Sequence, residues 1–330
     1  MNTNTQRDVG IDLLKAICML GVVSLHTQRS LTTGFCYNPW LYYLCRFSMP
    51  VFFMINGYLI LSHVTFDLKY FKKKTLNILR LVLIWSIITS IYYLLVYGHK
   101  SIKEIIYDFC KSFASRGVIP FWFFISFVII YTLVLIIGIN RVKSHLQLIV
   151  IVSGLLCVLF DIASLISIVN GGYFVQKYIP QSFRIWTWVF YFSLGYWINQ
   201  MTHKIKFLHL IVVSVVALIY QYFLCYMILG KINSEYCYDN IIIILWSCSL
   251  FVFFKNLNYS SIIGKAIVFV SKNSFGVFLL HPFLIDAFDL TNKIDSWSSG
   301  LLIWLIVFVA CFCFSVLLSR IPIIKSAFSY

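Results

Sequence analysis

Long apolar stretches alternate with short polar segments along the whole chain. Most stretches approach the length that a helix needs to cross the roughly 30 Å hydrocarbon core of a bilayer. About ten spans are predicted, at residues 11–26, 41–61, 78–97, 120–137, 146–166, 183–199, 207–229, 240–254, 266–288 and 300–318. We therefore expect an all-α, polytopic integral membrane protein, with residues 1–330 forming a single transmembrane domain and no fused soluble domain.

Composition supports this class and excludes a soluble protein. Charged residues make up 11% of the chain, against about 25% in typical soluble proteins. Apolar residues make up 61%, so the bilayer must solvate most of the surface. The 10 cysteines show no metal-ligand spacing, and we expect no metal site. Cys36 and Cys45 share one predicted loop, which leaves a disulfide between them open.

The charge pattern predicts the orientation of the chain. Basic residues cluster around the connection between the second and third predicted spans: Lys69, Lys72, Lys73 and Lys74 lie in it, and Arg80 lies at the start of the third span. By the positive-inside rule this loop is cytoplasmic, and ten spans then place both termini in the cytoplasm. The net charge of +15 is thereby explained by loop residues, and we expect no nucleic-acid partner. The same cluster suits a polyphosphate or anionic lipid head groups, or serves only to fix the topology.

Three ionisable residues lie in the first predicted span, where such groups are costly and often functional. They are Asp12, Lys15 and His26. Helix geometry places Lys15 and His26 within about 20° of one stripe and about 16 Å apart along the axis. This arrangement predicts a cation near the cytoplasmic side and an imidazole nearer the outer side. Alternatively, Asp12 and Lys15 form an interfacial pair and His26 merely ends the helix.

The ninth predicted span carries a second histidine. His281 precedes Pro282, and Ser274 lies seven residues earlier on the same face. Since the first and ninth spans run in the same direction, His281 is expected at a depth similar to that of His26. Pro282 removes a helical hydrogen bond and can kink the span beside His281. Alternatively, His281 bonds a neighbouring carbonyl and has a structural role.

Further polar or aromatic candidates lie near the outer half of the second and fourth predicted spans. Arg46 and Ser48 open the second span, and Asn56 lies midway through it before a glycine. A buried amide must find partners or substrate. Gly57 permits the close approach of another helix or of a slim ligand, and a helix-packing role for this segment is equally open. Arg46 serves as an interfacial anchor or an anion contact. Trp122 opens the fourth span and could instead belong to the interfacial aromatic belt.

Together these segments resemble the membrane acyltransferase family 3. Lys15 and His26 have the Arg/Lys-x10-His spacing of that family, and residues 52–58 resemble its Phe-Phe-x-x-Ser-Gly-Tyr/Phe segment. Trp122 with its neighbouring Phe matches a Trp-Phe element, and residues 274–282 resemble a Ser-x-x-x-Tyr-x-x-His-Pro motif. The likeness covers residues 7–285 and is strongest to the short O-acetyltransferases of enterobacterial common antigen and O-antigen.

Three departures from the family pattern affect what can be transferred. Asn56 stands where the family usually has Ser, and Phe278 replaces the usual Tyr. Lysines 72–74 and Arg80 stand near the place of an Arg-x-x-Arg donor motif. A hydroxyl role at position 56 and a phenol at position 278 are therefore in doubt.

The resemblance implies transfer of an acyl group, usually acetyl, from cytoplasmic acetyl-CoA to a hydroxyl of a cell-surface or lipid-linked glycan. It implies a bacterial cytoplasmic (inner) membrane location, membrane lipids as neighbours, and no bound cofactor. His26 would act as general base or carry the acyl group, Lys15 and Asp12 would help position the donor, and His281 would orient the acceptor or stabilise an oxyanion. Lys72, Lys73, Lys74 and Arg80 would bind the donor, while Arg46, Ser48, Asn56, Trp122 and Ser274 would contact substrate.

Other functional classes also fit a chain of this kind. A transporter or flippase for a lipid-linked sugar or small anion would use intramembrane charges and a central Asn-Gly. Against it, the sequence shows no repeated halves and no paired broken helices. A non-catalytic membrane subunit is a third hypothesis. The acceptor sugar, the acyl chain and the oligomeric state are not encoded in any recognisable pattern.

Overall fold

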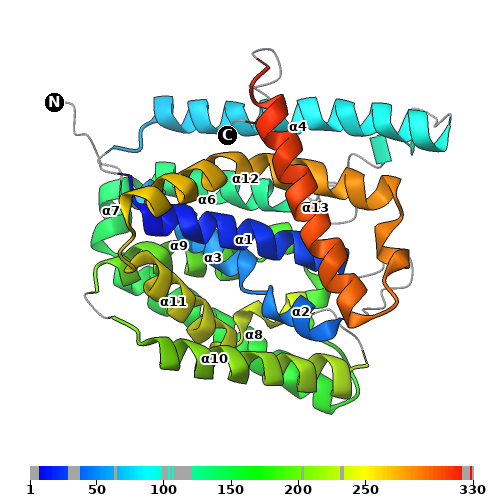
Figure 1. Ribbon diagram of the computed structural model, residues 1–330. Coiled ribbons are helices and arrows are strands. Elements are labelled where there is room, and N and C mark those ends of the chain that lie inside the picture. Colours follow the sequence, from blue (N-terminus) through cyan, green and yellow to red (C-terminus); the bar gives the residue numbers. More distant parts are fainter. Residues whose placement is uncertain are drawn as a thin grey trace.

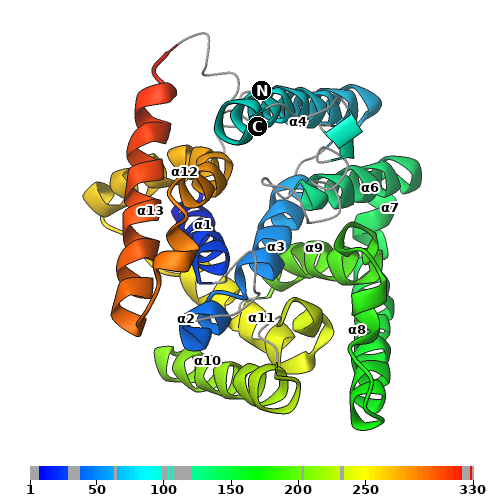
Figure 2. The same cartoon turned by 90° about the vertical axis from the view of Figure 1, so that its right-hand side faces the viewer.

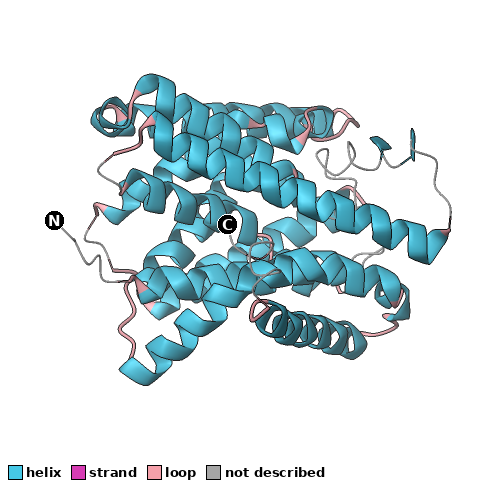
Figure 3. Cartoon of the chain, turned by 90° about the horizontal axis from the view of Figure 1, so that it is seen from above, coloured by secondary structure: helices cyan, strands magenta, loops and turns pink. Residues whose placement is uncertain are grey.

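The computed structural model describes residues 7–28, 38–62, 65–98, 103–104, 106–107, 121–201, 204–230, 234–321 and 328. This part of the chain consists of helices and loops and contains no strand (Figure 3). Within these described ranges, seven helices are long and apolar enough to cross a membrane. The prediction of an all-helical multi-pass membrane protein is thus confirmed, while the count of ten spans and the location of the termini stay predictions.

The helices follow the predicted spans closely. Seven described segments have the length and hydropathy of a span. They are α1 (Val9–Thr27), α2 (Pro39–Leu44) together with α3 (Ser48–Leu61), α4 (Leu68–Tyr97), α8 (Leu146–Val169), α10 (Phe207–Gln221) together with the π-helical turn η3 (Tyr222–Ile228), α12 (Ser261–Ala287) and α13 (Trp297–Leu318). Three further predicted spans are shorter helices, α6 (Trp122–Ile137), α9 (Ile185–Asn199) and α11 (Ile241–Lys255). Short elements complete the fold: α7 (Ile139–Ser144), η1 (Val175–Tyr178), η2 (Gln181–Phe183), η4 (Ser234–Asp239) and η5 (Leu290–Lys293).

Helix α1 lies at the centre of the bundle and contacts α12, α3, α11 and α13 (Figures 1 and 2). Its start is fixed by Asp8, whose carboxylate accepts a hydrogen bond from the backbone N–H of Ile11. Near its other end, Trp304 of α13 donates its indole N–H to the carbonyl of Leu20, and the Gln28 side chain donates to the carbonyl of Gly300. The helix that carries Asp12, Lys15 and His26 is therefore held at both ends.

Helices α3 and α9 pack backbone against backbone. A Cβ added to Gly57 would lie 1.7 Å from the carbonyl oxygen of Phe192, and one added to Gly195 would lie 2.0 Å from that of Met54. Only glycine leaves room for such a close approach. Gly57 therefore has the helix-packing role that the sequence left open.

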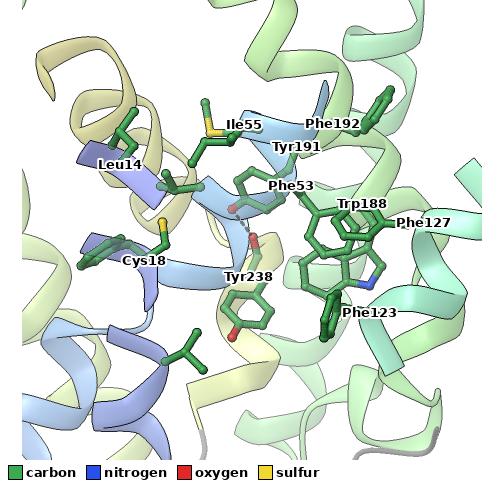
Figure 4. Close-up of a cluster of buried hydrophobic side chains, with 14 of the residues drawn as sticks. Leu14, Cys18, Phe53, Ile55, Phe123, Phe127, Trp188, Tyr191, Phe192 and Tyr238 are labelled. Atoms are coloured by element: carbon green, nitrogen blue, oxygen red, sulfur yellow. Dashed lines mark hydrogen bonds between the residues drawn. The ribbon is translucent and has the colours of Figure 1, made fainter. Parts of the chain in front are cut away.

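An aromatic cluster fills the space between α3, α6 and α9 (Figure 4). Phe53 stacks on Trp188 with ring centroids 4.4 Å apart and lies 4.6 Å from Phe127. Trp122 lies 5.1 Å from Trp188. These large buried rings hold the three helices in register through dispersion and aromatic contacts.

Two boundaries differ from the predicted ones. The span predicted at 41–61 is broken into α2 and α3, with Arg46 in the connecting turn. Helix α4 begins at Leu68, ten residues before the predicted start at 78, because Asp67 caps it by accepting from the backbone N–H of Tyr70. The basic cluster thus lies on the first turns of a long helix and not in a loop, which hydropathy alone could not reveal.

Candidate active site

The structure brings His26 and His281 together. Their ring centroids are 5.0 Å apart and the ring planes are tilted by 54°. His26 lies in the last turn of α1 and is partly exposed, whereas His281 on α12 is completely buried. Two imidazoles in contact within an apolar bundle form a pair of groups that can accept and donate protons at neutral pH.

One hydrogen bond defines the tautomer of neutral His281. Its Nδ1 lies 3.0 Å from the carbonyl oxygen of Val277, one turn earlier in α12. A carbonyl oxygen only accepts, so Nδ1 carries the proton and Nε2 presents a lone pair. Nε2 is buried and has no hydrogen-bond partner among the described residues. The sequence left open that His281 bonds a neighbouring carbonyl and has a structural role. The structure contains that bond, and it also leaves the Nε2 lone pair as a hydrogen-bond acceptor.

Pro282 does not end α12, which continues to Ala287. A proline has no backbone N–H, so the carbonyl of Phe278 lacks its usual helical donor. Proline therefore acts here by freeing a backbone acceptor beside the histidine.

At the opposite end of α1, the buried Asp12 is the centre of an ionic network whose cations are more exposed. Its carboxylate pairs with the Arg7 guanidinium and lies 3.7 Å from the Lys15 ammonium. Ser271 of α12 donates its hydroxyl to the same carboxylate at 2.7 Å. Arg7 and Ser271 were not among the predicted site residues, although Ser271 lies near Ser274 on α12.

Lys15 is partly exposed, and it also faces α4. Its positive charge repels that of Lys74, which is half-buried and lies over the ring of Tyr70. Lys72, Lys73 and Arg80 are exposed on the same helix. Four cationic side chains of α4 and Lys15 of α1 therefore contribute positive potential near the N-terminal end of α1.

Arg46 lies in the turn before α3 and is almost completely buried. Its guanidinium carbon is 4.7 Å from the ring centroid of Tyr238 and 5.5 Å from that of Tyr42. It also donates to the Tyr42 hydroxyl at 3.4 Å. A buried cation between two aromatic faces is a cation–π arrangement, which stabilises the charge of the guanidinium.

Four other predicted substrate contacts have protein partners. Ser48 donates to the carbonyl of Cys45, and Ser274 donates to that of Ser271. Asn56 donates to Phe52 and accepts from the Tyr131 hydroxyl at 3.2 Å. Trp122 belongs to the aromatic cluster described above. These contacts explain why the residues are buried, and their roles toward substrate stay predictions.

A second buried carboxylate, which the sequence did not single out, lies at the end of η4. Asp239 accepts hydrogen bonds from the side chains of Gln176, Trp186 and Thr187 at 3.0, 3.2 and 2.5 Å. Burial raises the pKa of this carboxyl above its ordinary value, and the three donors oppose that shift. In the sequence, the only hint of this site is that the acidic Asp239 directly precedes Asn240, which caps the apolar helix α11.

Two further charged residues, Asp161 of α8 and Arg184 in the turn before α9, bond to different groups. Asp161 accepts from the amide of Asn240 at 2.8 Å, whereas Arg184 donates to the carbonyl of Ile179 and lies over the ring of Tyr236. Of the possible disulfide pair Cys36 and Cys45, Cys36 lies outside the described residues.

These features define a multi-pass membrane protein with a histidine pair and an ionic network on one central helix. The chain belongs to the acyltransferase 3 family: the acyltransferase-domain profile of that family matches residues 8–320. Comparison with curated proteins and with solved structures gives no match. The protein is therefore a membrane acyltransferase, and the family resemblance drawn from its motifs is confirmed.

Proposed function

We propose that this protein transfers an acetyl group from cytoplasmic acetyl-CoA to a hydroxyl of a cell-surface or lipid-linked polysaccharide, within a bacterial cytoplasmic membrane. The observation that carries the proposal is the contact between His26 and His281, with ring centroids 5.0 Å apart inside an apolar bundle. Proton transfer by a positioned imidazole is what a sugar hydroxyl needs to attack a thioester at neutral pH.

The charge distribution supports a polyanionic donor. Lys15, Lys74 and the exposed cations of α4 gather near the end of α1 that is opposite to His26. Coenzyme A carries several phosphate charges on its nucleotide part, which such a cluster attracts. Lys15 and His26 are eleven residues apart on one continuous helix, about 16 Å along its axis. An extended pantetheine arm can bridge a separation of this order.

In the proposed reaction, His26 takes the proton of the acceptor hydroxyl while the hydroxyl oxygen bonds to the thioester carbonyl carbon. The tetrahedral intermediate then collapses, the carbon–sulfur bond breaks, and the imidazolium returns the proton to the leaving thiolate. Asp12 holds Lys15 in place through their ion pair, so Lys15 can counter negative charge on the donor.

His281 is assigned the task of orienting the acceptor. Its Nδ1 proton is used by the carbonyl of Val277, so neutral His281 offers only the acceptor lone pair of Nε2. That atom suits a hydrogen bond from a substrate hydroxyl. It does not suit stabilisation of an oxyanion, which requires a donor.

Purified protein in lipid nanodiscs, supplied with acetyl-CoA labelled in the acetyl group and a lipid-linked glycan acceptor, tests the proposal. Label should move to the glycan as free coenzyme A appears. His26→Ala should lower both rates by about 10²–10⁴-fold, while His209→Ala, which removes an exposed histidine of α10, should leave them unchanged. Equal rates in wild type and His26→Ala protein would remove His26 from the mechanism, and absence of any acetylated acceptor across a panel of envelope glycans would remove the polysaccharide assignment.

A measurement without acceptor separates the two histidine mechanisms. An acyl-histidine intermediate releases one equivalent of coenzyme A rapidly and leaves labelled protein. A general-base mechanism releases no such burst, because the thioester is attacked only by the acceptor hydroxyl.

A further inference from the structure

Two buried cysteines face each other across the segment that follows α10. The Sγ atoms of Cys225 and Cys237 are 3.6 Å apart. Both side chains are fully or almost fully buried, Cys225 in η3 and Cys237 in η4. Among the other described cysteines, no thiol–thiol contact of this kind occurs, although Cys18, Cys157 and Cys311 are equally buried. Burial as small apolar side chains explains those residues, but it does not explain a direct pair.

We propose that Cys225 and Cys237 form a disulfide bond in the mature protein. A disulfide needs its sulfur atoms about 2.05 Å apart, so the two Sγ atoms must move closer together than the 3.6 Å at which they lie here. Two thiols lose two protons and two electrons as the sulfur–sulfur bond forms. The electrons reduce the disulfide of a thiol–disulfide oxidoreductase of the compartment outside the membrane, which becomes a dithiol.

The location of the pair favours oxidation. Helix α10 follows the basic residues Lys204 and Lys206, which the charge pattern assigns to the cytoplasm, so η3 and η4 lie at the outer end. η3 also contacts α2, just beyond the end of α1 that carries His26, and the rings of Trp40 and Tyr222 stack at 4.3 Å. The inference thus rests on the predicted orientation and is independent of the acetyl-transfer proposal. Oxidation would occur as the segment emerges, before the thiols are buried.

The bond would fix a segment that carries other polar contacts. Directly after Cys237, the carbonyl of Tyr238 accepts from the Tyr191 hydroxyl at 2.7 Å (Figure 4), and the ring of Tyr238 faces Arg46. Asp239 and its three donors follow. A covalent link from Cys237 to η3 therefore restrains the placement of Tyr238 against the buried guanidinium.

Mass spectrometry on the full-length protein, produced in cells with an oxidising outer compartment, tests the disulfide. The protein is denatured in N-ethylmaleimide without reductant and digested. We expect a peptide pair linked through Cys225 and Cys237 that disappears after reduction, while Cys157 and Cys311 carry the maleimide. Maleimide on both Cys225 and Cys237 before reduction, or a link from either one to a different cysteine, would overturn the proposal.

Thermal unfolding gives a second measurement. A reductant should lower the Tm of wild-type protein by several degrees and should leave the Tm of the Cys225→Ser, Cys237→Ser double variant unchanged. The Cys237→Ser single variant should already lose the whole effect, because one missing thiol abolishes the bond. An equal response of wild type and double variant to the reductant would contradict the disulfide even where all proteins fold.

Discussion

The imidazole of His26 meets that of His281 at 5.0 Å, although the two residues come from helices near opposite ends of the chain. The contact exists because α1 and α12 pack side by side along the centre of the bundle. The Nδ1 proton of His281 is donated to Val277, so its Nε2 accepts only. The pair is thus asymmetric, with a partly exposed His26 beside a buried neutral acceptor.

This asymmetry predicts different effects for the two histidines. His281→Leu keeps a side chain of comparable size but removes the acceptor nitrogen, so kcat should fall by about 10²-fold as the acceptor hydroxyl loses its orientation. Steady-state kinetics of the nanodisc-embedded variant provide the measurement, with His209→Ala as the matched control. A rate equal to that of wild type would show that His281 has a structural role only.

The hydroxyl of Ser271 ties α12 to Asp12 of α1, and its removal should be measurable. Ser271→Ala deletes a hydrogen bond to a charged group, which contributes about 1.5–3 kcal/mol to stability, while Arg7 and Lys15 stay paired with the carboxylate. The Tm should fall, and transfer should slow less than in His26→Ala. Ser249→Ala is the control, since the buried Ser249 hydroxyl bonds only within its own helix. Equal Tm losses in the two variants would show that the link between helices adds nothing.

Periodicity and charge predicted much of the fold. All-helical spans, the shared stripe of Lys15 and His26, and a depth for His281 comparable with that of His26 follow from rise and rotation along regular helices. The break at Arg46 and the early start of α4 did not follow, because each depends on a local turn or a cap that hydropathy averages away.

Contacts between distant helices could not be predicted from one sequence. Three hydrogen bonds join residues from different helices or loops: those from Ser271 to Asp12, from Tyr131 to Asn56 and from Thr187 to Asp239. Their partners depend on how the helices rotate and pack, and no single-helix periodicity carries that information. The Gly57 contact is an exception, since a glycine within an apolar helix already indicates close approach.

The packing of α3 on α9 predicts which glycines tolerate a methyl group. Gly57→Ala places its Cβ 1.7 Å from a backbone oxygen that cannot rotate away, so α3 and α9 must separate at a cost of at least about 1–3 kcal/mol. Gly264→Ala is the control, because its Cβ meets only the side chain of Val9 at 3.7 Å. The amount of protein recovered from the membrane and its Tm should fall for Gly57→Ala alone. Normal recovery and Tm for Gly57→Ala would contradict the close packing.

The proximity of Lys74 to Lys15 predicts a specific effect on donor binding. Lys74→Gln removes one charge from the half-buried end of the cluster, so the KM for acetyl-CoA should rise about tenfold, equivalent to about 1.4 kcal/mol. The KM for a short acetyl thioester without phosphates should not change. Lys206→Gln, which removes an exposed cation before α10, should alter neither value. A similar rise for both donors would show that Lys74 acts on the fold and not on phosphate groups.

The buried Asp239 predicts a pH-dependent stability. Burial raises the pKa of its carboxyl in the folded protein, so the folded state retains a proton at pH values where the unfolded chain, with a pKa of about 3.9, has released it. The contribution of this proton to stability is complete below the unfolded pKa and is lost as the pH rises through the folded pKa. Asp239→Asn has no proton to lose, so the Tm of wild type relative to this variant should decline from pH 4 upward and then level off. Thermal unfolding in detergent at a series of pH values gives the curve, and a difference that stays constant or grows with pH would contradict a raised pKa at Asp239.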